Sequence, residues 1–558
     1  MEAAATLVEH YERVATEFLQ TAVVIDDQAL VARGAVQDAR EHQPEPEATE
    51  HEEAPTRLPR THDGGVHGEL IVPEEDMGAA HDLDSHRLIE AFARLGIICG
   101  VLAPQEGEPH ERTLEAVLPA ARAGDLLIID WVQHKDRGEA TLALLEAVLA
   151  GDAQRQRVIA IYTGEPNLLD VAERTAELVD RALPDPPLKR DEGAMDMTKG
   201  AARVVVLAKP DAVPADGQPD RRVAFAELPS RMCREFAAAT VGIVRGAAVA
   251  ALGALRGDTH RLLARLTNEL DLGYVGHRIA QPRPADAEEH LARLVFAEVV
   301  SVLGEHSIGA QGDSAAVRLW LDGRPSPPMN QNEEPGYGRS ISDKQTLNRE
   351  EVYRLLDNGL GDEKVRAAYE FRLATAKTLK RAARQSTEIV STDVDEARRA
   401  DELFSALMTL ESSYRRPDRS LRLGTIVAQP DGARLLCVQP VCDSVRLCQE
   451  NGRRFPFVPL EPRSTSQPAD LVIIDGDQRD RVSIVVKPFE VILHEMPASN
   501  GGTVQPAGDP PAYRTSSGLK LRWLAQMKVD HAQRVAERLG GSFARVGVDE
   551  PEILRLSR

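Results

Sequence analysis

The sequence predicts an α/β fold: a doubly wound, five-stranded parallel sheet, followed by a helical region and an α+β C-terminal domain. Short apolar runs alternate with amphipathic stretches in the N-terminal part, which is typical of parallel βαβ units. Aromatic residues make up only 4% of the 558 residues, whereas 42% are hydrophobic. The core must therefore be built mainly from Ala, Leu and Val, which favours helices and α/β packing over an aromatic-rich β-sandwich.

Five apolar runs predict the strands of the parallel sheet. They lie at residues 22–25, 97–102, 126–129, 158–162 and 204–207. Between them, apolar residues at three-and-four spacing predict helices at 85–95, 111–122, 139–149 and 168–183. Because parallel strands need crossover connections, and these are right-handed, we expect helices on both faces of the sheet.

The predicted N-terminal domain, residues 1–215, contains two insertions. The first, 34–81, includes a stretch at 38–77 with 12 acidic residues, 3 basic residues and five prolines. This composition predicts a solvated, disordered loop. The second insertion, 184–202, is also rich in proline and charge.

Three further regions follow. Residues 216–315 are predicted to be a helical domain through which two copies of the chain could dimerise. Its most apolar segment, 236–255, carries Arg245 at the middle, so we expect a buried helix and no membrane span. A Pro- and Gly-rich linker at 316–345 leads to the α+β domain at 346–558, whose function no motif identifies.

The charge and the cysteines exclude some classes of protein. A net charge of −21 argues against a general nucleic-acid-binding surface. The five cysteines make no disulfide framework, and the N-terminus lacks the features of a signal peptide, so we expect a cytoplasmic protein. We interpret Cys437, Cys442 and Cys448 as buried strand cysteines, because their spacing fits no zinc module.

A basic amphipathic segment at 519–539 predicts a terminal helix. A solvated face on a packing helix is the favoured interpretation. A DNA-recognition helix is the alternative, although the residues before it do not form the expected helix and tight turn.

Polar residues follow four of the predicted strands. Asp26 and Asp27 follow the first, Asp130 the third, Thr163 the fourth, and Lys209 with Pro210 the fifth. The carboxyl ends of parallel strands meet at one edge, where such sheets bind ligands. Three carboxylates brought together call for a cation, and oxygen ligands suit Mg²⁺.

This ordered set resembles the receiver domain of bacterial two-component response regulators. The matching segments are VVIDD (Val23–Asp27), DLLIIDWVQHKDRG (Asp125–Gly138), VIAIYTG (Val158–Gly164) and VVVLAKP (Val204–Pro210). The resemblance implies a flavodoxin-like sheet, Mg²⁺ held by Asp26, Asp27 and Asp130, and Asp130 as the phosphoacceptor. It also implies that Thr163 and Lys209 contact the phosphoryl group. The adjacent acidic pair comes first in the chain, which argues against a haloacid-dehalogenase-type phosphatase.

Two departures from the family pattern leave alternatives open. The insertions are long, and Val206 stands where receivers often carry a switching aromatic residue. The leading hypothesis is a signalling protein that accepts a phosphoryl group on Asp130 from a histidine kinase in a phosphorelay and later hydrolyses it. The alternatives are a non-phosphorylated pseudo-receiver that docks a kinase-like ATP-binding partner, and a receiver that controls a C-terminal effector.

Overall fold

A computed structural model describes most of the chain. The described residues are 7–27, 29, 85–104, 110–133, 136–151, 155–182, 187–212, 218–284, 286–323, 349–363, 386–391, 393–412, 418–448, 452–465, 467–476, 478–499 and 501–543. They divide into two compact units, Met1–Arg324 and Pro325–Arg558. The predicted acidic insertion at 34–81 lies outside the described residues, and the predicted domain boundaries remain predictions.

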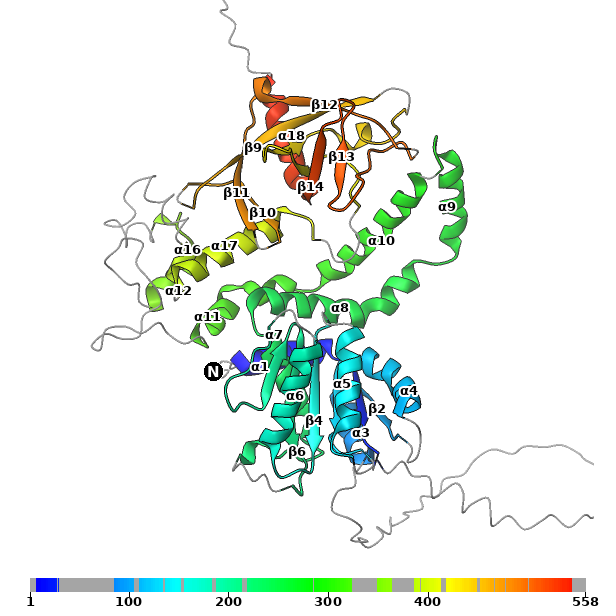
Figure 1. Ribbon diagram of the computed structural model, residues 1–558, viewed down its shortest axis with the longest axis vertical. Helices are drawn as coiled ribbons and strands as arrows, with labels where there is room; N and C mark the ends of the chain where they lie inside the picture. Colours follow the sequence, from blue (N-terminus) through cyan, green and yellow to red (C-terminus); the bar gives the residue numbers. More distant parts are fainter. Residues whose placement is uncertain are drawn as a thin grey trace, which may run out of the picture. The chain divides into compact units, whose positions relative to one another are not determined.

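The first unit contains the strands β2, β4 and β6 labelled in Figure 1. They belong to a six-stranded sheet of order β2-β1-β3-β4-β6-β5. The strands are β1 (Thr21–Ile25), β2 (Ile98–Leu102), β3 (Leu126–Asp130), β4 (Arg157–Thr163), β5 (Asp196–Lys199) and β6 (Ala202–Ala208). The five predicted strands are all present and pair in parallel, in the order 2-1-3-4-5 of flavodoxin-like folds. The α/β prediction is therefore confirmed.

Helices cover both faces of this sheet. On one face, α4 (His110–Ala123), α5 (Glu139–Gly151) and α6 (Leu168–Ala182) contribute to one hydrophobic core. On the other face, the core includes residues of α1 (Leu7–Phe18), α3 (Ser85–Arg94) and α7 (Leu228–Thr240). Every side chain of the two central strands, β3 and β4, is buried, whichever face of the sheet it lies on, as expected for a parallel sheet covered on both faces.

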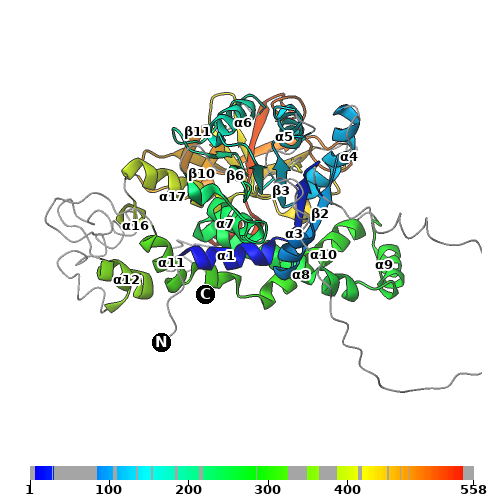
Figure 2. The same cartoon turned by 90° about the horizontal axis from the view of Figure 1, so that it is seen from below.

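The helical region continues from α7 with α8 (Ile243–Arg265), α9 (Glu269–Ala280), α10 (Asp286–Glu305) and α11 (Ser314–Asp322). Helix α1 lies beside both α7 and α8 (Figures 1 and 2). Two glycines of α8 allow this close approach: a Cβ on Gly253 would lie 3.2 Å from the Glu17 carbonyl oxygen, and one on Gly246 would lie 2.8 Å from the Tyr11 ring. No helix among the described residues has the length and apolar character needed to cross a bilayer.

Several details of the first unit differ from prediction. The second insertion contributes a sixth strand, β5, which pairs antiparallel with β6. It was not predicted, because its sequence, DMTK, is mostly polar. The segment at 236–255 is not one buried helix, because Gly242, with φ of 142°, separates α7 from a partly exposed α8. Residues 316–322, predicted as linker, belong to α11.

The second unit is an antiparallel sheet flanked by helices, which confirms the predicted α+β class. Its sheet has the order β10-β11-β9-β8-β7-β14-β13, and β12 also pairs with β9. The strands are β7 (Thr425–Ala428), β8 (Arg434–Cys437), β9 (Arg453–Pro462), β10 (Leu471–Asp475), β11 (Gln478–Ile484), β12 (Ile492–Met496), β13 (Ala512–Arg514) and β14 (Lys520–Gln526). The helices are α12 (Arg349–Asn358), α16 (Ser386–Ile389), α17 (Val394–Thr409) and α18 (Val529–Phe543).

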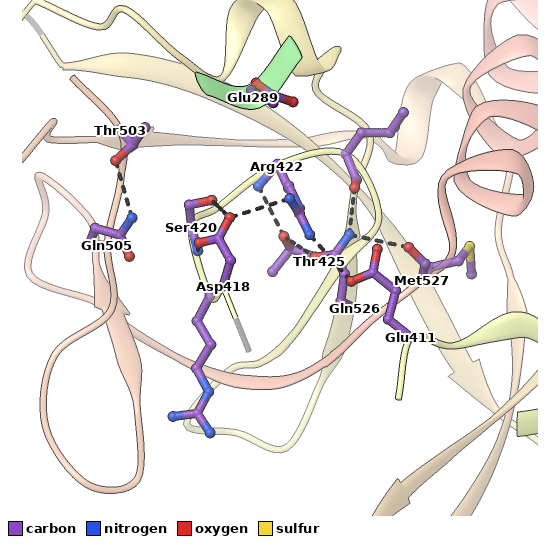
Figure 3. A network of polar contacts seen from close by, with 12 residues as sticks. Glu289, Glu411, Asp418, Ser420, Arg422, Thr425, Thr503, Gln505, Gln526 and Met527 are labelled. Atoms are coloured by element: carbon purple, nitrogen blue, oxygen red, sulfur yellow. Dashed lines mark hydrogen bonds and ion pairs between the residues drawn. The ribbon is translucent and has the colours of Figure 1, made fainter. Parts of the chain in front are cut away.

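A buried polar network joins two central strands of this sheet. The Thr425 hydroxyl donates to Gln526 Oε1 over 2.9 Å (Figure 3). Gln526 Nε2 donates to the Leu423 carbonyl over 2.7 Å. Because both side chains are buried and hydrogen-bonded, they hold β7 against β14 without leaving polar groups unsatisfied.

Two predictions for this unit were wrong. The basic segment at 519–539 is not one helix: its first half forms strand β14, and only the second half belongs to α18. Cys437 is buried in β8 as expected, but Cys442 and Cys448 are exposed, because they lie beyond the end of that strand.

Candidate functional site

The predicted site residues meet at the carboxyl end of the parallel sheet. Asp26 follows β1, Asp130 ends β3, Thr163 ends β4, and Lys209 follows β6. All four are buried, and Asp27 is half-buried. The ladder fixes their positions, since the Lys209 amide donates to the Thr163 carbonyl over 2.8 Å and the Asp26 amide to the Leu102 carbonyl over 3.1 Å.

Lys209 bridges two of the carboxylates. Its Nζ lies 2.9 Å from Asp26 Oδ2 and 3.1 Å from Asp130 Oδ2. Burial alone would lower the pKa of the ammonium, but Asp130 and Asp26 outweigh it, so the pKa of Lys209 is raised. The lysine therefore stays charged and holds the two strand ends together.

The three aspartates form a compact acidic cluster. One carboxylate oxygen of each of Asp26, Asp27 and Asp130 lies within 4.8 Å of the others. Desolvation by burial raises the pKa of Asp130 to about 7, Lys209 opposes this shift, and Asp26 and Asp27 add to it. Three carboxylates face one ammonium, so the site carries excess negative charge that a divalent cation would neutralise.

The donor set fits Mg²⁺. It consists of carboxylate oxygens only, which a hard divalent cation prefers, and one of the three carboxylates, that of Asp27, is only half-buried. A cation there would favour the ionised form of Asp130.

Thr163 is brought to the same edge but is held differently. Its hydroxyl oxygen accepts the Glu165 amide over 3.0 Å, so its proton is left to donate elsewhere. The strand register places Asp130 opposite Tyr162 and Thr163 opposite Ala208, the residue before Lys209. Thr163 is thus a neighbour of both Asp130 and Lys209 along the edge.

The loop after Asp130 contains residues that the sequence reasoning missed. The Thr141 hydroxyl donates to the Asp130 carbonyl over 2.6 Å, and Gln133 Nε2 donates to that hydroxyl over 3.2 Å. The Asp136 carboxylate accepts the amides of Gln133, Gly138 and Ala140, which caps the start of α5. Asp136 three residues before Glu139 was a readable helix-start signal.

Trp131, directly after Asp130, is buried against Gly138. A Cβ on Gly138 would lie 2.4 Å from the indole ring, and the residue has φ of 85°, so glycine is required on both grounds. The Arg174 guanidinium lies 4.9 Å from the centre of the indole ring. These contacts hold Trp131, the residue next to Asp130, in place.

A second aromatic residue, Tyr162, lies beside the site but on the opposite face of β4 from Thr163. Its hydroxyl donates to the Val223 carbonyl over 2.7 Å. Val206, at the position of the usual switching aromatic residue, is buried in β6. An aromatic side chain is therefore present near the site, on the neighbouring strand.

Comparison with known proteins agrees with this geometry. The family described as the response receiver domain matches residues 18–214. No curated protein and no solved structure matches the chain. The match covers β1 to β6 and every residue of the candidate site, and it ends before α7. Residues 18–214 of this chain are therefore a response receiver domain.

Proposed function

We propose that this protein is a response regulator in which Asp130 accepts a phosphoryl group from a histidine kinase in a phosphorelay. The observation that carries the proposal is the bridge of Lys209 to Asp26 and Asp130 inside the acidic cluster. In the transfer, an ionised Asp130 oxygen attacks phosphorus, a P–O bond forms, and the P–N bond to the kinase histidine breaks. The released imidazole nitrogen takes up a proton.

The chain's own groups serve this step in distinct ways. Lys209 stabilises the ionised form of Asp130 before the reaction and neutralises a phosphoryl oxygen after it. The Thr163 hydroxyl donates to another phosphoryl oxygen. Mg²⁺, when bound by Asp26, Asp27 and Asp130, supplies positive charge to the phosphoryl oxygens. The aspartyl phosphate is finally hydrolysed by water.

Incubation with acetyl phosphate and MgCl₂ tests the proposal. The wild-type full-length chain should gain one phosphoryl group that is labile in acid and in base, measured by intact mass. Asp130→Asn should gain none. Asp170→Asn, which removes an exposed carboxylate at the start of α6, should react like the wild type. An adduct that persists in Asp130→Asn, or none in the wild type, would overturn the proposal.

One specific observation favours the alternative, a non-phosphorylated pseudo-receiver that acts as a scaffold. Val206 cannot act as a switching aromatic residue, and a pseudo-receiver would dock a kinase-like ATP-binding partner without phosphorylation. Hydrogen exchange after addition of beryllofluoride and MgCl₂ separates the two. Changed exchange in α7 supports the response regulator, and unchanged exchange supports the scaffold.

We further propose a cytoplasmic protein that dimerises through its helical region. The free cysteines agree with a reducing compartment. Apolar side chains on α9 and α10 are strongly exposed, among them Leu272 (82%), Ile279 (77%) and Phe296 (67%). Two such helix pairs from two copies would bury these faces in a four-helix bundle. Sedimentation of the wild type against Ile279→Glu tests this.

A further inference from the structure

A cavity in the second unit is lined by four cationic side chains. It has a volume of about 930 Å³ and lies between the β7–β8 turn, strands β13 and β14, and the loop segments 497–499 and 504–510. The four cations are Arg434, Arg514, Lys520 and Arg522. A cavity of this size matches the pockets that hold small ligands and cofactors, roughly 300–1,000 Å³.

The sheet register places all four cations on one face. Arg522 pairs with Ala428, which pairs with Arg434, so these three form a row across β14, β7 and β8. Lys520 pairs with Arg514, and it lies two residues from Arg522 on the same strand. Directly paired residues, and residues two apart in a strand, project to the same side of a sheet.

Two of these cations have carboxylate partners and two do not. Arg434 pairs with Asp480, and Arg522 lies 2.8 Å from Asp475. Arg514 and Lys520 form no ion pair with any residue that the structure describes, although they stand directly opposite each other. Like charges opposite each other destabilise a sheet, so this arrangement favours an anion between them.

The remaining lining leaves room for more than a single ion. The floor between the cations consists of Ala428 and Ala512, whose side chains are small. The walls carry Pro430, Pro497 and Pro510, together with polar groups such as Gln505, which Thr503 holds by a hydrogen bond of 3.2 Å (Figure 3). Asp509, the one acidic residue of the lining, is exposed on its loop.

We propose that this cavity binds a small phosphorylated molecule of nucleotide size, whose phosphate groups lie between Arg514 and Lys520. Arginine offers a fork of donors to phosphate oxygens, and lysine adds a point charge. The mixed apolar and polar walls receive the rest of the molecule. A nucleic-acid strand fits less well, because the chain carries a net charge of −21.

Calorimetric titration of the full-length chain tests this site, with sodium pyrophosphate, ATP and adenosine as separate probes in EDTA. Pyrophosphate and ATP should bind saturably, ATP more tightly, and adenosine alone weakly. The double variant Arg514→Gln/Lys520→Gln should weaken ATP binding at least tenfold. The matched control Arg534→Gln/Arg538→Gln removes two exposed cations from α18 and should change it less than twofold.

The thermal midpoint of the ligand-free chain gives a second measurement. Removing two opposed cations should leave the midpoint unchanged or raise it, so weaker binding cannot be ascribed to unfolding. No saturable binding, or equal binding by both double variants, would overturn the proposal. A single-stranded 20-mer that binds more tightly than ATP and is lost in the same variant would also overturn it. None of these outcomes depends on whether Asp130 is phosphorylated.

Discussion

Arg256 in α8 makes a two-point ion pair with Asp125, with distances of 3.2 Å from Nη1 to Oδ1 and 2.9 Å from Nη2 to Oδ2. Asp125 is buried and directly precedes β3, the strand that ends at Asp130. The amide and hydroxyl of Thr21 also donate to Asp125 Oδ2. The helical region is thus attached to the amino end of the same strand that carries the proposed phosphoacceptor at its carboxyl end.

Arg256→Gln should destabilise the first unit. The change leaves the buried Asp125 carboxylate with hydrogen bonds but without its closest cation. We expect the free energy of unfolding to fall by about 1–3 kcal/mol. This is the lower part of the range for a broken buried ion pair, because Arg256 is partly exposed. Urea unfolding, monitored by the hydrogen exchange of β3 peptides, measures this loss of stability. Arg261→Gln, which removes an exposed arginine from its pair with Asp258 on the same helix, should cost less than about 0.5 kcal/mol. Equal losses in both variants would contradict this role of Asp125.

The raised pKa of Asp130 predicts a pH dependence of stability in EDTA. The carboxyl has a pKa of about 7 when folded and an ordinary one near 3.8 when unfolded, so between these values the folded state binds more protons. Stability should therefore fall as the pH rises from about 4 to about 7, by at most about 1.4 kcal/mol per pH unit from this group, and level off above pH 7. Asp130→Asn should lose this slope and should be more stable than the wild type at pH 8. Unfolding by urea at pH 5, 6, 7 and 8 checks this, and parallel slopes for the two proteins would refute it.

The sequence was sufficient to predict the parallel strands and the site at their ends, because both depend on local patterns. Buried strands appear as continuous apolar runs, and the topology of a parallel sheet brings their carboxyl ends together. The edge strand β5 was missed because only one of its faces is buried and its sequence, DMTK, has just one apolar residue. The strand β14 was predicted as part of a helix because its sequence, KLRWLAQ, is amphipathic both with the period of a helix and with the period of a strand.

The contacts that hold the strands of the site in place could not be predicted, for a different reason. Asp125 is 131 residues from Arg256, and Tyr162 is 61 residues from Val223. Such pairs are set by packing of distant segments, and no local pattern marks them. The cavity in the second unit is a similar case, because its four cations meet only through the order of β13, β14, β7 and β8.

Gly138→Ala should strongly destabilise the first unit. The new methyl group would meet the Trp131 ring, and the backbone at φ of 85° disfavours any side chain. We expect a loss of about 3 kcal/mol, combining overpacking with backbone strain. Gly193→Ala is the matched control: its φ is 73° and no atom lies within 4 Å of the added Cβ, so only the strain of about 1 kcal/mol remains. Urea unfolding measures both, and similar losses would show that the contact with Trp131 is unimportant.

Tyr162 links the site to the helical region through Val223. The Val223 amide donates to the carbonyl of Ala208, which precedes Lys209, and its carbonyl accepts the hydroxyl of Tyr162, which precedes Thr163. Val223 is therefore hydrogen-bonded to the residues that precede Thr163 and Lys209, and it lies five residues before the start of α7. Tyr162→Phe should keep phosphoryl acceptance from acetyl phosphate but reduce the change in hydrogen exchange of α7 on addition of beryllofluoride and MgCl₂. It should also cost about 1–3 kcal/mol of stability, because a buried carbonyl loses its donor.

Tyr513→Phe is the control for Tyr162→Phe, because it removes an equivalent bond, from a buried tyrosine to the Arg419 carbonyl, in the second unit. That control should lose stability there and keep the full exchange response in α7, whereas an unaltered response in Tyr162→Phe would exclude this route of coupling.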